Sequence, residues 1–133
     1  MLNCKYYIMK KGLSIFILSS LVIAMGMLQG CKKATIPELT TVVVTEVTLS
    51  SAISGGTIIA DGGEDITGKG VCWSSSANPT IADQKTIDGT GSASATSNIV
   101  GLSEGTTYYV RAYATNEVGT AYGNELTFTT DEV

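Results

Sequence analysis

Residues 102–116 read LSEGTTYYVRAYATN, and this stretch decides the fold. From residue 107 onward successive side chains would point to opposite sides, as they do on a β-strand that buries one face. The face expected to lie in the core carries Tyr108, Val110, Ala112 and Ala114. The opposite, outward face carries Tyr109, Arg111, Tyr113 and Thr115. The stretch therefore predicts one long, half-buried strand.

The rest of the chain after residue 39 has the same character. Short runs rich in Val, Ile, Thr and Tyr alternate with turn clusters such as Asp61-Gly62-Gly63, and no window shows apolar residues at helical spacing. We expect strands at 40–49, 52–60, 66–74, 92–99, 106–116 and 121–130, with a short extra strand at 85–87. About seven short strands in one domain predict an all-β fold, a two-sheet antiparallel sandwich.

Particular motifs make this expectation more specific. Leu102 stands six residues before Tyr108, which resembles the tyrosine corner of fibronectin type III domains. The segments VCWS (71–74), NPT (78–80), TYYVRAYATN (107–116) and GTAYGNE (119–125) together resemble the fibronectin type III-like domain of Bacteroidetes lipoproteins. The resemblance implies a fibronectin type III or immunoglobulin-like sandwich, with structural roles for Trp73, Leu102 and Tyr108. Such domains serve as spacers, adhesion modules or carbohydrate-associated modules, so it implies no single activity.

The first 30 residues have the pattern of a signal peptide. Lys5, Lys10 and Lys11 precede an uncharged apolar run at 13–28, which is shorter than the roughly 20 residues that span a bilayer. The run leads into Leu28-Gln29-Gly30-Cys31, which resembles the lipobox of bacterial lipoproteins. We therefore expect a lipoprotein signal peptide at 1–30, lipidation of Cys31, a tether at 31–38 and the folded domain at 39–130. The alternative is an uncleaved anchor with a free Cys31.

The residues after Cys31 bear on localisation. Lys32 rather than Asp follows the cysteine, which resembles lipoproteins that are passed on to the outer membrane. No acidic residue occurs before Glu38, whereas surface-exported lipoproteins of Bacteroidetes-like bacteria often carry an acidic run there. We expect a lipid-anchored protein of the outer membrane, and both its periplasmic and its cell-surface face remain open.

Composition excludes several classes of function. The chain has 8 basic and 12 acidic residues and no histidine, so the basic patch that neutralises phosphates is missing and nucleic acid is not an expected partner. Loss of the three leader lysines would make the mature chain more acidic still. With Cys4 in the leader and Cys31 lipidated, Cys72 stands alone, so we expect neither an internal disulfide nor a metal cluster. We predict a buried structural role for Cys72, no cofactor and no enzymatic activity.

Two groups of residues are candidates for ligand binding. An outward row of Tyr109, Arg111, Tyr113 and Tyr122 could stack on sugar rings, although cross-strand aromatic pairs also stabilise sheets without binding anything. Asp61, Glu64 and Asp65 crowd one loop and could hold Ca²⁺, but their spacing matches no EF-hand pattern, and solvated turn residues are the preferred interpretation.

These features lead to one expected function and one alternative. The expected function is a lipid-anchored cell-envelope module with a non-catalytic structural or protein-interaction role. The alternative is a carbohydrate-binding accessory module of a surface glycan-use system. The expected partners are the membrane, through the N-terminal lipid, and an unidentified envelope protein or glycan.

Overall fold

The computed structural model describes residues 32–133, and this part of the chain contains strands and no helix. The strands are β1 (Glu38–Thr45), β2 (Ser51–Ala60), β3 (Gly68–Ser74), β4 (Gln84–Lys85), β5 (Ala95–Val100), β6 (Thr107–Thr115), β7 (Thr120–Tyr122) and β8 (Leu126–Thr129). No helix among these residues is long and apolar enough to cross a membrane. The expected leader and Cys31 lie outside the described residues.

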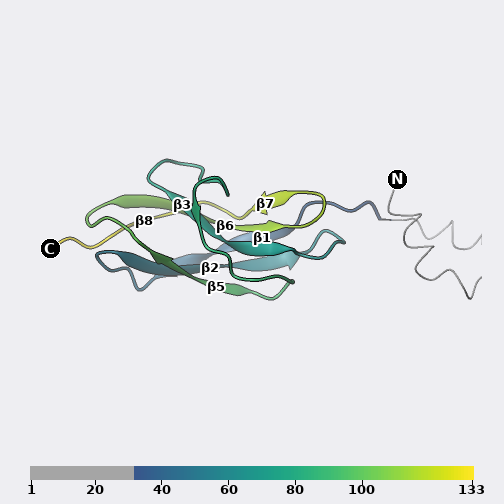
Figure 1. Ribbon diagram of the computed structural model, residues 1–133, viewed down its shortest axis with the longest axis horizontal. Helices are drawn as coiled ribbons and strands as arrows, with labels where there is room; N and C mark the ends of the chain where they lie inside the picture. The colour runs from purple at the N-terminus through teal and green to yellow at the C-terminus, as the bar shows by residue number, and fades with distance from the viewer. Residues whose placement is uncertain (1–31) are drawn as a thin grey trace, which may run out of the picture. The chain divides into compact units, whose positions relative to one another are not determined.

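The strands form two antiparallel sheets, as Figure 1 shows. One sheet has the order β1-β2-β5, and the other has the order β4-β3-β6-β7, with β8 also paired to β6. The predicted all-β, two-sheet antiparallel sandwich is therefore confirmed. The strand count is eight because the expected strand at 121–130 is divided into β7 and β8.

The division between β7 and β8 has a physical cause in β1. The Thr41 hydroxyl accepts a hydrogen bond from the Ala112 amide at 2.9 Å and donates one to the Asn124 carbonyl at 2.6 Å. At Gly123 a Cβ would lie only 2.7 Å from that hydroxyl, so the close approach of β1 requires a glycine. Thr41 thus fills the gap between β7 and β8 and joins the two sheets.

The core lies between the inner faces of the sheets. Val71, Ile99 and Val110 are fully buried, and Trp73 is 6% exposed among them. The alternation of β6 behaves as expected on this face, because Val110, Ala112 and Ala114 are buried and Tyr108 is half-buried against the cluster. Packing of these side chains between the sheets excludes water from both inner faces, which is the main source of stability in such a fold.

The folded unit begins earlier than the predicted boundary at residue 39. Residues from Thr35 to Val133 form one compact unit. The Thr35 amide donates to the Gly62 carbonyl at 2.9 Å, three residues before β1 starts. Residues 35–37 are therefore part of the domain and not of the tether.

Candidate functional site

The start of β6 is held in place by Tyr108, the tyrosine of the predicted tyrosine corner. The Ser103 amide donates to the Tyr108 hydroxyl at 2.9 Å, which is the bond that the tyrosine-corner resemblance implies. Leu102 is buried in the core beside it, and the Tyr108 ring stacks on Phe128 with centroids 5.8 Å apart. Tyr108 is half-buried, so part of the residue remains accessible at this end of the sandwich.

The expected row of outward aromatic residues is not an exposed surface, and for Tyr113 the expectation of exposure is wrong. Tyr113 is only 5% exposed, and its hydroxyl donates to the Thr86 carbonyl. The physical reason is that residues 79–86, which include β4 beside β3, bond to the outward side chains of Arg111, Tyr113 and Tyr122. We call this segment the covering loop. Alternation along β6 indicates which side chains point outward but not what lies over them.

Arg111 and Tyr122 do lie together, and they hold the covering loop in place. The Arg111 guanidinium sits 4.1 Å from the centroid of the Tyr122 ring, and its Nε donates to the Pro79 carbonyl. The Tyr122 hydroxyl accepts a hydrogen bond from the Ile81 amide at 3.1 Å. Tyr109 is half-buried on the same face. In this arrangement Arg111 and Tyr122 bond to the protein's own loop, so they are not free to stack on a sugar ring.

Cys72 lies under the same loop. It is completely buried, and its Sγ lies 3.5 Å from the Arg111 carbonyl oxygen. Burial raises the pKa of the Cys72 thiol from its ordinary 9.0 to about 11, although the nearby Arg111 guanidinium lowers it in part. The thiol is therefore protonated at neutral pH and packs as a small hydrophobic group, as expected.

The acidic loop gives no support to a calcium site. The Asp61 carboxylate accepts a hydrogen bond from the Gly63 amide at 2.8 Å, which is the bond of an Asx turn. Within residues 32–133 no group of three or more His, Cys, Asp or Glu residues is placed to hold a metal ion. Asp61 thus has the hydrogen bond of a turn residue.

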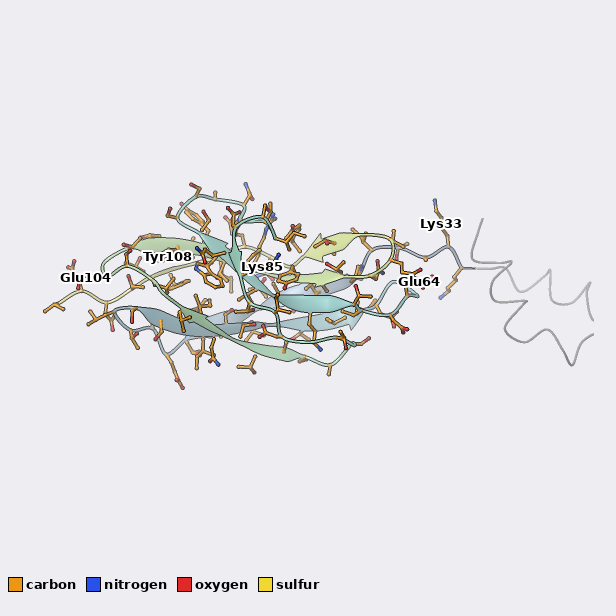
Figure 2. All side chains as sticks on the ribbon, viewed as in Figure 1. Lys33, Glu64, Lys85, Glu104 and Tyr108 are labelled. Atoms are coloured by element: carbon orange, nitrogen blue, oxygen red, sulfur yellow. The ribbon has the colours of Figure 1, made fainter. Side chains whose placement is uncertain are left out.

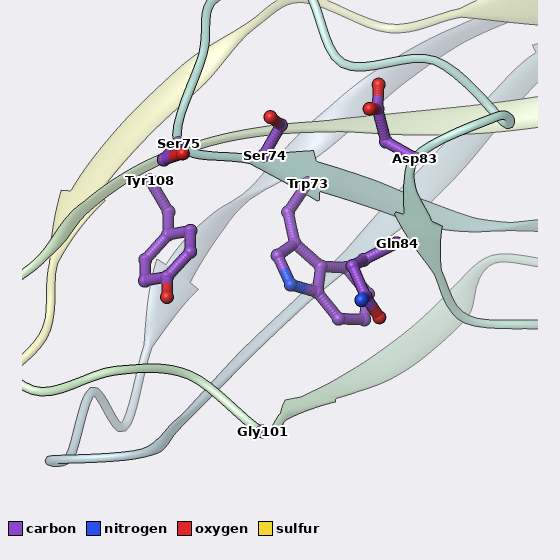
Figure 3. Close-up of a pocket in the computed structure, with 7 residues that line it drawn as sticks. All are labelled: Trp73, Ser74, Ser75, Asp83, Gln84, Gly101 and Tyr108. Carbon is purple, nitrogen blue, oxygen red and sulfur yellow. The ribbon is translucent and has the colours of Figure 1, made fainter.

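A polar recess lies where β3 ends and β6 begins. Figure 3 shows Trp73 and Tyr108 beside it, with Ser74, Ser75, Asp83, Gln84 and Gly101 completing the lining. Gln84 is paired with Trp73 across β3 and β4, which places both side chains on one side of the ladder. The volume is about 260 Å³. This is less than the ~300–1,000 Å³ of ordinary small-molecule sites.

A second, more apolar groove lies at the same end. It runs between the β1–β2 turn and the ends of β2 and β5, and Val47, Ile53 and Val100 form much of its wall. Its volume is about 430 Å³, and Val100 is 63% exposed. Sequence reasoning found neither recess, because both are assembled from turns and strand ends that are far apart in the chain.

The fold and these features define a fibronectin type III/immunoglobulin-like β-sandwich domain. No family model matches the chain, and no curated protein matches it. Among solved structures, a fibronectin type III domain of human collagen XX is 25% identical, with 76% of this chain and 98% of that one covered and a TM-score of 0.55. The sensor domain of the anti-sigma factor RsgI4 from Pseudobacteroides cellulosolvens is 19% identical, with 76% and 100% covered and a TM-score of 0.55. A redesigned β-sandwich protein is 24% identical, with 76% and 99% covered and a TM-score of 0.50.

Proposed function

We propose that this chain is a lipid-anchored module of the cell envelope with a non-catalytic structural or protein-interaction role. The fold supports the coarser part of this statement, because sandwiches of this kind are generally non-catalytic modules. The charged leader, the short apolar run and Cys31 in register support the anchor. The same pattern, with Lys32 after the cysteine, supports the outer membrane as the location.

The observation that carries the proposal is the short distance in sequence between the expected lipid and the folded unit. The domain is ordered from Thr35, four residues after Cys31. A folded sandwich attached so closely to an acylated cysteine is suited to contacting neighbouring envelope components. At the far end of its strands it offers an apolar groove and a polar recess for such contacts.

Membrane fractionation and intact-mass analysis test the anchor. We expect the native protein to start at Cys31, to carry the mass of acyl chains and to sediment with membranes. The Cys31→Ala protein should lose both the added mass and the membrane association, whereas Cys4→Ala, a matched change inside the leader, should retain them. Membrane association of Cys31→Ala at the native level would refute the lipid anchor.

In-cell crosslinking tests the interaction role. We expect the native protein to be crosslinked to a neighbouring envelope protein and the Cys31→Ala protein to lose that product, because the domain is no longer held at the membrane. Identical crosslinked products in both proteins would show that membrane proximity does not select the partner.

A carbohydrate-binding accessory role is the second candidate, and the polar recess favours it. The half-buried Tyr108 lines this recess, and Asp83 and Gln84 provide carboxylate and amide groups that can bond to sugar hydroxyls. The likeness to a sensor domain fits a module that recognises a ligand. If the candidate is right, a soluble glycan raises the thermal midpoint of the native protein and not that of Gln84→Ala. No shift with any glycan of a broad panel would leave only the structural or protein-interaction role.

A further inference from the structure

The chain is held firmly at the point where it enters the sandwich. The Thr35 amide donates to the Gly62 carbonyl at 2.9 Å, and the Asn116 Nδ2 donates to the Thr35 carbonyl at 2.7 Å. The same Nδ2 donates to the Asp61 carbonyl at 2.8 Å. Asn116 is 4% exposed, so its amide is buried, while Thr35 and Asp61 themselves are exposed. Thr35 is therefore fixed to the β2–β3 turn and to the β6–β7 turn together.

Little chain is left between this point and the expected lipid. Only Lys32, Lys33 and Ala34 separate Cys31 from Thr35. Four fully extended steps cover at most about 14 Å. A domain joined at Thr35 to so short a linker cannot rotate freely, because rotation would have to carry Thr35 away from the acylated cysteine. The two turns that bind Thr35 must stay next to the bilayer.

The surface at these turns suits contact with lipid. Ile36 is 48% exposed and Val118 is 50% exposed. Ile36 packs against the β6–β7 turn that carries Val118, since a Cβ at Gly119, the next residue, would lie 3.3 Å from the Ile36 Cγ2. The turns at this end carry the exposed carboxylates Asp61, Asp65 and Glu117, and the exposed Lys32 and Lys33 precede Thr35 in the sequence. Exposed aliphatic side chains next to charges of both signs are compatible with a layer of zwitterionic headgroups. A strongly anionic layer would repel the three exposed carboxylates.

We propose that the anchor-side end, defined as residues 35–37, 61–65 and 116–119, rests on a zwitterionic lipid surface with Ile36 and Val118 in contact with the headgroup layer. This inference depends on the proposed lipidation of Cys31. It places the β1–β2 turn, the β5–β6 turn and the two recesses on the side away from the membrane. Figure 2 shows Glu64 at the anchor-side end and Glu104, in the β5–β6 turn, at the opposite end of the sandwich.

Fluorescence quenching in vesicles tests this orientation. The full lipidated protein is placed in phosphatidylcholine–phosphatidylethanolamine vesicles that carry a headgroup-attached quencher. A dye is attached at Asp65→Cys or at Glu104→Cys, both of which replace exposed residues. The only other thiol in the folded domain, Cys72, is buried and does not compete for the dye. We expect severalfold stronger quenching at position 65 than at position 104.

Two valine variants test the contact itself. Val118→Asp should reduce quenching at position 65, whereas Val43→Asp, which changes a 69% exposed valine on β1, should not. Equal quenching at 65 and 104 in membrane-bound protein overturns the proposed orientation. Unchanged quenching in Val118→Asp overturns the lipid contact of this end. Protein that lacks acyl chains and does not bind the vesicles refutes the proposed anchor instead, so the two failures are distinguishable.

Discussion

Asn116 is the residue whose loss should alter both the stability of the domain and its connection to the tether. Its Nδ2 donates to the carbonyls of Thr35 and Asp61, and its Oδ1 accepts from the amides of Val118 and Gly119 at 2.9 and 3.2 Å. One buried side chain thus holds the entering chain, the β2–β3 turn and the β6–β7 turn. Asn116→Ala removes all four hydrogen bonds at once.

The expected loss can be worked out from these bonds. A hydrogen bond contributes a net ~0.5–1.5 kcal/mol to folding. Thr35 and Asp61 are exposed residues whose carbonyls water can reach once the side chain is gone, so the lower half of the range applies. Four bonds then correspond to about 2–4 kcal/mol. For a domain of this size that lowers the thermal midpoint by roughly 10–30 °C.

Asn116→Asp separates the two roles of the side chain. The ionised carboxylate can still accept from the Val118 and Gly119 amides, but it cannot donate to the Thr35 and Asp61 carbonyls. We therefore expect the turn to persist at neutral pH and the entering chain to be released. The matched control is Asn124→Ala, because Asn124 bonds to Thr41 and not to the entering chain.

Two measurements check the expectation. Denaturant titration followed by the fluorescence of Trp73, the single tryptophan, gives the free energy of unfolding. Hydrogen exchange at the Thr35 amide, which bonds to the Gly62 carbonyl, reports on the entering chain. The Thr35 amide should be protected in the native protein and in Asn124→Ala and should exchange quickly in both Asn116 variants. An unchanged midpoint in Asn116→Ala, or a protected Thr35 amide in Asn116→Asp, would refute the reasoning.

Three further predictions concern the interior. Tyr108→Phe should cost about 1 kcal/mol, because the Ser103 amide loses its acceptor, and equal denaturation midpoints would remove the tyrosine corner. The raised pKa of Cys72 means that the contribution of the protonated thiol to stability is complete below pH 9 and is lost as the pH rises toward about 11. The denaturation midpoint of Cys72→Ala should therefore fall less steeply than that of the native protein over that interval. Parallel plots of midpoint against pH for the two proteins would contradict this. Lys69 is 5% exposed, and its Nζ donates to the carbonyls of Gly91 and Ala93. Lys69→Ala should therefore lower the free energy of unfolding by about 2 kcal/mol or more. A change below 0.5 kcal/mol, roughly the size of a surface substitution, would show that the site is not closed to water.

Much of the fold could be predicted because the strand pattern is local. The period of two along β6 was enough to place Val110, Ala112 and Ala114 in the core. The bond between Ser103 and Tyr108 was also accessible from sequence, because five residues and one turn separate the partners. Interactions of this range depend mainly on backbone geometry that the sequence pattern specifies.

The features that were not predicted depend on contacts between distant segments. Asn116 reads as an ordinary turn residue, yet its amide bonds to Thr35, 81 positions away. Tyr113 reads as an outward residue, yet the covering loop buries it. In both cases the local pattern predicts the direction of a side chain. Which distant segment contacts that side chain depends on tertiary packing, which the local pattern does not specify. A clue was present in the covering loop, because Pro79 is an apolar residue in a polar stretch, and it is fully buried.

The strands that join the two ends of the domain set the distance at which a partner can be met. β6 runs without interruption from beside the polar recess, at Tyr108, to the β6–β7 turn that binds Thr35. Eight residues of strand at ~3.3 Å each separate these points by about 26 Å. If the anchor-side end rests on the bilayer, both recesses lie about 26 Å above the membrane surface. The linker between Cys31 and Thr35 can add at most about 14 Å to this distance. A partner for the far end must therefore lie within about 40 Å of the membrane surface, which favours another membrane-attached protein or a polymer layer next to the bilayer over a freely diffusing target.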